Sequence, residues 1–262
     1  MKAQRVSGQS AFSDHVEFQL VSQPLDARIV IVFLHGLDTD AEDGWGRPGA
    51  SKTFVTRLIE DIPAAAVGTF SYSSALRHFL QDGLTIDALA HGVAGVFCER
   101  LLEAYRRVVV IGHCLGGSIA VTALRLVSGR APQKSGWSPA WGSVAMFLID
   151  APFAVPDHGP SEWLHGLMET LTYTGELAQS NAAFWAERLV GPPKQRLPVE
   201  AHALISDSSS WVTPLRPDAW LPESNVRRIA LSHLDIARPA EDGPFPTYDY
   251  IVEWLGTSNA GG

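Results

Sequence analysis

A thiol lies at the centre of the most informative stretch of the chain, Gly112-His113-Cys114-Leu115-Gly116-Gly117. The apolar run 108–111 before it predicts a buried strand, and residues 118–124 after it continue at helical spacing. A sharp turn from strand to helix strains its central residue, so the flanking residues must be very small, as these glycines are. The turn would project the Cys114 side chain beside the positive end of a helix. The pattern therefore predicts that Cys114 is a nucleophile.

A nucleophile of this kind needs a base, and the base needs a group that orients it. The candidate base is His233, which directly follows the last predicted strand. Two carboxylates could hold its Nδ1–H: Asp207 follows the predicted strand 199–206, and Asp150 ends the predicted strand 144–150. We favour Asp207, and Asp150 stays open as the alternative.

Acyl chemistry also needs N–H donors for the oxyanion that forms during attack. One donor is expected to be the amide of Leu115, the residue after the nucleophile. The other is expected in the loop after the apolar strand 28–34. There the pair His35-Gly36 lets the backbone turn inward, which makes the Leu37 amide the second candidate.

Strand and helix signals alternate along the chain, which predicts a mainly parallel sheet flanked by helices in one α/β domain spanning 1–262. The predicted strands cover 16–21, 28–34, 64–72, 108–111, 144–150, 199–206 and 226–232, and the predicted helices cover 51–62, 86–105, 118–124 and 247–255.

The segment 153–198 has no strand pattern and carries large apolar side chains at helical spacings. We expect a helical cap or lid, inserted within the domain, that covers the site and supplies an apolar wall for the acyl group. The alternative is a helical excursion packed on the core. The predicted substrate-facing residues are Trp163, Leu167, Met168, Leu171 and Trp185.

Composition narrows the possible partners. The net charge of −8 and the lack of a Lys/Arg cluster argue against nucleic acid, and no apolar run is long enough to span a membrane. Residues 1–15 lack the apolar core of a secretory signal, and the two cysteines, Cys98 and Cys114, are expected to be free thiols. We therefore expect a cytoplasmic protein. The spacing of Cys and His predicts no metal site, and no cofactor is indicated.

These motifs resemble those of α/β-hydrolases, in particular lipase-like esterases related to the serine-active-site-containing proteins. The stretch 32–37, with Trp45 soon after, is similar to their FVHGL…W opening, the cysteine turn is similar to GHSLGG, and 232–239 is similar to their H-x-x-I-x-[KR]-[PF] ending. The resemblance implies the α/β-hydrolase fold, a cap after its sixth strand, and Cys114 in the serine position. The chain departs from the pattern in that cysteine and at 149–153, where a GTPHxG-like segment is expected.

A thiolate attacks esters and thioesters, and its thioester intermediate can pass the acyl group to water or to another nucleophile. We therefore expect a hydrolase that cleaves a small ester or thioester through Cys114, His233 and Asp207, or an acyltransferase of the same design. Three interpretations of the cysteine stay open. It belongs to a natural enzyme of the dienelactone-hydrolase or thioesterase kind, to a serine esterase engineered from Ser to Cys, or to a non-catalytic binding or interaction module.

Overall fold

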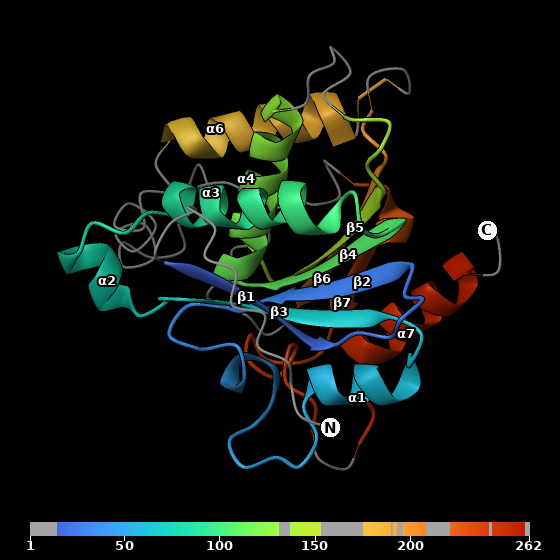
Figure 1. The fold of residues 1–262 in the computed structure, drawn as a ribbon. Helices are drawn as coiled ribbons and strands as arrows, with labels where there is room; N and C mark the ends of the chain where they lie inside the picture. The colour runs from blue at the N-terminus through green and yellow to red at the C-terminus, as the bar shows by residue number, and fades with distance from the viewer. Residues whose placement is uncertain are drawn as a thin grey trace.

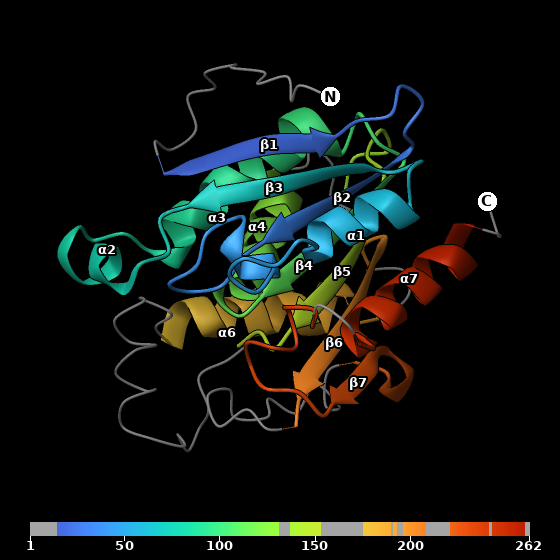
Figure 2. The same ribbon diagram turned by 90° about the horizontal axis from the view of Figure 1, so that it is seen from below.

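The structure is a computed structural model that describes residues 15–130, 137–152, 175–189, 191–192, 196–207, 221–240 and 243–259. Their framework is a seven-stranded sheet with the order β1-β3-β2-β4-β5-β6-β7 (Figure 2). The strands are β1 (Val16–Ser22), β2 (Ile29–Leu34), β3 (Ala66–Tyr72), β4 (Arg107–His113), β5 (Ser143–Ile149), β6 (Val199–Ser206) and β7 (Val226–Ile229). All seven lie where the sequence predicts strands, within a few residues at each end.

The sheet is parallel except for β1, which pairs antiparallel with β3 at one edge. The central strands β2 and β4 are almost continuous runs of Val, Ile, Leu and Phe, and apart from the half-buried Ile29 their apolar side chains are fully buried. Such runs are typical of parallel strands covered on both faces.

Helices cover both faces of the sheet (Figure 1). The helices α3 (Ile86–Val96), α4 (Leu115–Arg130) and α6 (Gly175–Phe184) lie on one side, and α1 (Phe54–Asp61) and α7 (Pro246–Asn259) lie on the other. The short helix α2 (Leu76–Gln81), which follows β3, was not predicted. Shorter helical turns are η1 (Asp43–Trp45), η2 (Phe97–Leu101), η3 (Trp185–Leu189) and η5 (Glu223–Asn225).

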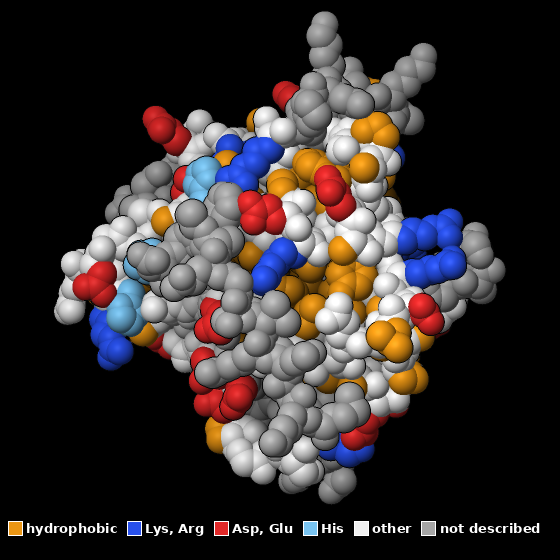
Figure 3. All heavy atoms as spheres, in the orientation of Figure 1, with side chains coloured by type: hydrophobic (Ala, Val, Ile, Leu, Met, Phe, Trp, Pro, Cys, Tyr) orange, Lys and Arg blue, Asp and Glu red, His pale blue; other side chains and the backbone are white. Residues whose placement is uncertain are grey.

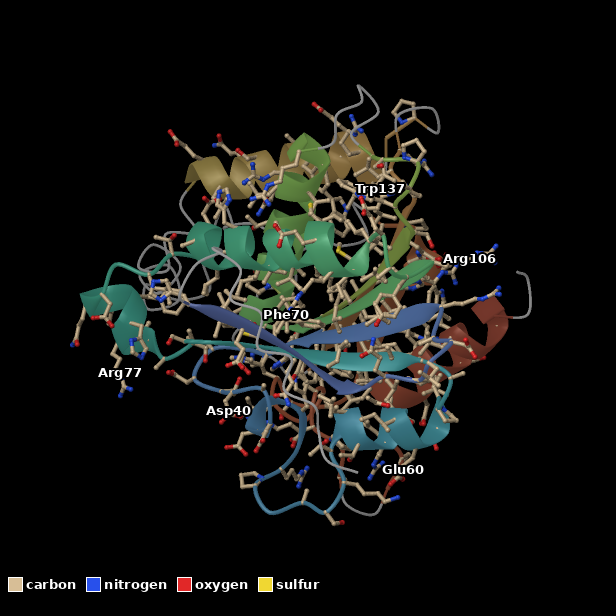
Figure 4. All side chains as sticks on the ribbon, viewed as in Figure 1. Asp40, Glu60, Phe70, Arg77, Arg106 and Trp137 are labelled. Atoms are coloured by element: carbon tan, nitrogen blue, oxygen red, sulfur yellow. The ribbon has the colours of Figure 1, made fainter. Side chains whose placement is uncertain are left out.

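The two faces bury separate hydrophobic clusters. Phe70 on β3, labelled in Figure 4, packs against Phe97 on the α3 side, and the two ring centroids are 6.0 Å apart. On the other side, Phe33 contacts both Trp45 and Phe54 edge-on. Among the described residues drawn in Figure 3, charged side chains of both signs are scattered over the side of the molecule seen in Figure 1, with hydrophobic atoms exposed between them.

The register of the sheet determines where a site can form. Leu34 pairs with Gly112, and His113 pairs with Ile149, so β2, β4 and β5 end at the same edge. Further along the sheet, Ser206 pairs with Ile229. The residues that follow these strands therefore meet at one carboxyl edge, which is where ligands bind in open α/β sheets.

The predicted cap is only partly described. It follows β5, the fifth strand of this chain rather than a sixth. Trp163, Leu167, Met168 and Leu171 lie outside the described residues. They remain predictions about the substrate wall.

The described part of the segment packs on the core, and this packing bears on the prediction for Trp185. In α6, the buried Asn181 donates to the Thr122 hydroxyl at 2.8 Å and accepts from Arg125 at 2.9 Å, both on α4. Trp185 then follows in η3 and is only 2% exposed within the main cluster. The Arg188 carbonyl accepts from Leu197, just before β6 begins, so η3 lies toward the amino edge of the sheet. Cys114 lies at the opposite, carboxyl edge, so this packing favours the alternative for Trp185, a helical excursion packed on the core.

Within the described ranges, no helix is both long enough and apolar enough to cross a membrane. Cys98 and Cys114 are free thiols. In the same part of the chain, no group of three or more His, Cys, Asp or Glu residues is arranged to hold a metal ion.

Candidate active site

Cys114 occupies the turn between β4 and α4, as the sequence predicts. Its N–H donates to the Ile149 carbonyl at 2.9 Å, and its own carbonyl accepts from Gly117 at 3.0 Å in the first turn of α4. Its φ of +50° lies in the left-handed region, which is costly for a residue with a Cβ. Such strain in a non-glycine residue persists where the surroundings enforce it, and it is concentrated at functional sites.

The glycines around Cys114 are required by close packing. A Cβ on Gly116 would lie 2.1 Å from the Leu34 carbonyl oxygen, which belongs to backbone and cannot swing away. A Cβ on Gly117 would lie 2.3 Å from the Cβ of Ala151. The turn can therefore press α4 against the ends of β2 and β5 only with glycine at both positions.

His233 lies beside Cys114 and is held by Asp150. The distance between His233 Nδ1 and Asp150 Oδ2 is 2.6 Å, and the Asp150 side chain is completely buried. The other oxygen of Asp150 accepts the Ser206 N–H at 3.2 Å. Asp150 also has a positive φ, +46°, at the end of β5. The carboxylate is thus fixed between the ends of β5 and β6, in contact with the imidazole of His233.

The expected contact between Asp207 and His233 is not formed. Asp207 is exposed, and its backbone N–H continues the ladder to β7 by donating to the Ile229 carbonyl at 3.0 Å. The structure places the alternative residue, Asp150, against His233 instead. The physical reason is position in the sheet: Asp150 follows β5, which is adjacent to β4 and Cys114, whereas Asp207 follows β6, one strand further away.

The protonated form of His233 is strongly favoured. Burial lowers the pKa of its imidazole, but hydrogen bonds to Asp150 and Cys114 and the charges of both groups outweigh burial and raise the pKa to about 10. At neutral pH the imidazole is therefore protonated, with Nδ1–H donated to Asp150 and the Nε2 side available to the sulfur.

The His233 loop is anchored by two side chains that the sequence analysis did not assign to the site. His113 is buried, and its Nε2–H donates to the His233 carbonyl at 2.8 Å. Burial, followed by the nearby charge of His233, lowers the His113 pKa to about 3, so this ring is a neutral donor. The Ser206 hydroxyl donates to the Leu231 carbonyl. Both contacts join residues far apart in sequence, so no local pattern could have revealed them.

The two predicted oxyanion donors both belong to segments next to Cys114. Leu115 is the first residue of α4 and is 2% exposed, so its amide belongs to the helix N-terminus. Leu37 is half-buried in the loop after β2, the loop that also carries Asp40 (Figure 4). A Cβ on Gly36 would lie 3.2 Å from the Cβ of Cys114, so this loop passes directly beside the sulfur-bearing residue.

Solved structures share this arrangement of sheet and helices. A protein from Agrobacterium vitis S4 assigned as a hydrolase superposes with a TM-score of 0.58 at 16% identity, over 95% of each chain. The α/β-hydrolase fold is the shared architecture. This chain has the α/β-hydrolase fold.

Other α/β-hydrolase structures superpose over similar lengths. A carboxylesterase of the ammonia-oxidising Nitrososphaera gargenis gives a TM-score of 0.54 at 10% identity, over 94% of this chain and 95% of its own. The epoxide hydrolase of Bacillus megaterium gives 0.51 at 12% identity, over 93% and 96%. No family model and no curated protein matches the sequence. Because one fold supports many reactions, the activity depends on the residues of the site and not on the fold.

Proposed function

We propose that this protein is a hydrolase that cleaves a small ester or thioester through an acyl-enzyme on Cys114, with His233 as the acid and base and Asp150 as the residue that orients it. The observation that carries the proposal is the chain of contacts from Asp150 through His233 to Cys114 at the carboxyl edge of the sheet. The names of the structural neighbours, which include a carboxylesterase and an epoxide hydrolase, support a hydrolytic role.

The reaction follows from these groups. The Cys114 thiolate attacks the acyl carbon, a C–S bond forms, and the carbonyl π electrons move to oxygen. When the tetrahedral intermediate collapses, the leaving alcohol or thiol takes the proton from His233 Nε2 and a thioester remains on sulfur. Neutral His233 then removes a proton from water, which attacks the thioester, and the carboxylic acid is released with the thiolate restored. Another nucleophile in place of water would give acyl transfer.

Asp150 keeps Nδ1 of His233 protonated throughout, so that Nε2 is the nitrogen that exchanges protons. The Leu37 and Leu115 amides are the proposed oxyanion donors, and one such donor is worth about 3 kcal/mol in the transition state. The strained backbone at Cys114 and the buried carboxylate both cost stability. Their presence together favours a catalytic role over the non-catalytic binding module.

The test is intact mass spectrometry after incubation with an acetyl thioester and with p-nitrophenyl acetate. We expect an adduct of one acetyl group on the wild type, mapped to Cys114, and none on Cys114→Ala. Cys98→Ala is the matched control and should acylate as the wild type does, because burial raises the pKa of the Cys98 thiol. Acylation of Cys98, or an unmodified Cys114 in a folded protein, would refute the proposal.

A further inference from the structure

The loop after β2 fixes one peptide plane more firmly than its neighbours. The carbonyl oxygen of Gly36 accepts the Thr39 hydroxyl at 2.9 Å and lies 3.1 Å from His35 Nδ1. This carbonyl belongs to the same peptide as the Leu37 N–H. Because the C=O and N–H of a trans peptide point in opposite directions, holding the oxygen also sets the direction of that N–H.

The protonation state of His35 fits a donor to the Gly36 carbonyl. Burial lowers its pKa to about 4, so the ring is neutral at pH 7 and carries a single N–H. His35 Nδ1 also lies 3.3 Å from the Thr39 hydroxyl. A hydrogen on Nδ1 can be donated to the Gly36 carbonyl or to this hydroxyl oxygen, whereas a bare Nδ1 would place its lone pair against that of the Gly36 carbonyl. The ring itself is held by stacking on Tyr72, with centroids 4.1 Å apart, and the Tyr72 hydroxyl donates to the His35 carbonyl.

The two amides that follow Leu37 in this loop are used elsewhere. Asp38 N–H donates to the Ser74 carbonyl at 3.1 Å, and Thr39 N–H donates to the Ser74 hydroxyl at 3.2 Å. Asp38 has a φ of +52°, so the chain reverses sharply at this residue. Among the described residues, these bonds leave the Leu37 amide uncommitted, on a loop in contact with Cys114.

We propose that Thr39 and His35 are positioning residues: they hydrogen-bond to the Gly36 carbonyl and so direct the Leu37 N–H toward the oxyanion formed on attack by Cys114. This inference rests on the proposed function. Two donors on one carbonyl also polarise the peptide, which strengthens its N–H as a donor. Neither side chain needs to touch the substrate. Both would stabilise only the transition state, because the oxyanion forms only on attack.

The test compares two reactions of the same sulfur. Acylation by p-nitrophenyl acetate passes through an oxyanion, whereas alkylation by iodoacetamide forms the C–S bond as iodide leaves and needs no oxyanion hole. Removing a whole oxyanion donor costs about 10²–10³ in rate, so a merely misdirected one should cost roughly tenfold. We expect Thr39→Val to slow the acylation burst by about this factor. The rate at which iodoacetamide alkylates Thr39→Val, and the KM of this variant for p-nitrophenyl acetate, should stay within about twofold of the wild type, because only transition-state binding is lost.

Thr39→Ser keeps the hydroxyl and should restore the burst rate. His35→Phe keeps a ring against Tyr72 without the Nδ1 donor, and it carries the same test if Thr39→Val does not fold. Wild-type acylation in both Thr39→Val and His35→Phe, or equal losses in acylation and alkylation, would overturn the inference. If the wild type is alkylated but never acylated, the proposed function fails and the inference fails with it.

Discussion

Replacement of Asp150 by Asn tests the assignment of the orienting residue most directly. Asn has nearly the same shape, and it tolerates the left-handed backbone that Asp150 adopts at φ +46°. Its amide oxygen can still accept the Ser206 N–H. The substitution therefore removes the negative charge under His233 while keeping the local packing.

The expected loss of kcat is large because the contact between Asp150 and His233 is short and buried. The bond from Asp150 to His233 Nδ1 is 2.6 Å, and the carboxylate side chain is 0% exposed. An amide cannot hold the imidazole in the same tautomer, and in a serine protease the equivalent change lowers kcat by about 10⁴. At 1.36 kcal/mol per factor of ten, a loss of about 10³–10⁴ corresponds to roughly 4–5 kcal/mol of transition-state stabilisation.

The assay is steady-state hydrolysis of p-nitrophenyl acetate, with thermal melting to confirm folding. Asp207→Asn is the matched control: it makes the same chemical change at an exposed carboxylate on the next strand, and it should keep kcat within about twofold, as surface substitutions away from a site usually do. A folded Asp150→Asn protein with near-wild-type kcat, or a larger loss in Asp207→Asn, would refute the reasoning.

Three further predictions test packing, the insertion and pH dependence. Gly116→Ala should lower Tm sharply because its Cβ would meet backbone at 2.1 Å, whereas Gly129→Ala, in open space on the same helix, should leave Tm unchanged or raise it; equal melting points would contradict this. Trp185→Ala should lower the free energy of unfolding, measured by chemical denaturation, by about 3–5 kcal/mol. The relative rates on acetyl and octanoyl esters should not change, and a changed chain-length preference would show that Trp185 contacts the acyl group. The pKa of His233 rises from 6.5 to about 10 on folding, so its stabilising contribution should be complete below pH 6.5 and lost as pH rises toward 10. Denaturation measured across that range should show this fall in the wild type and a smaller one in His233→Ala; parallel curves would argue against the raised pKa.

The sequence by itself determined the strands, the cysteine turn and the position of His233. Buried parallel strands appear as uninterrupted apolar runs, and a strained turn between strand and helix admits only small neighbours. These requirements act over a few residues, so they leave a local pattern. Helix α2 leaves no such pattern, because its six residues carry little periodicity of their own.

Only the tertiary structure decided which carboxylate meets His233 and what Trp185 contacts. Asp150 and Asp207 each follow a strand and are equivalent as sequence signals, but the order of strands in the sheet places only Asp150 under the imidazole. Trp185 has the helical spacing of a lid residue, yet the hydrogen bonds of Asn181 to α4 fix α6 so that Trp185 is buried in the core. In both cases the outcome depends on contacts between residues more than 50 positions apart, and those contacts exist only once the sheet has formed.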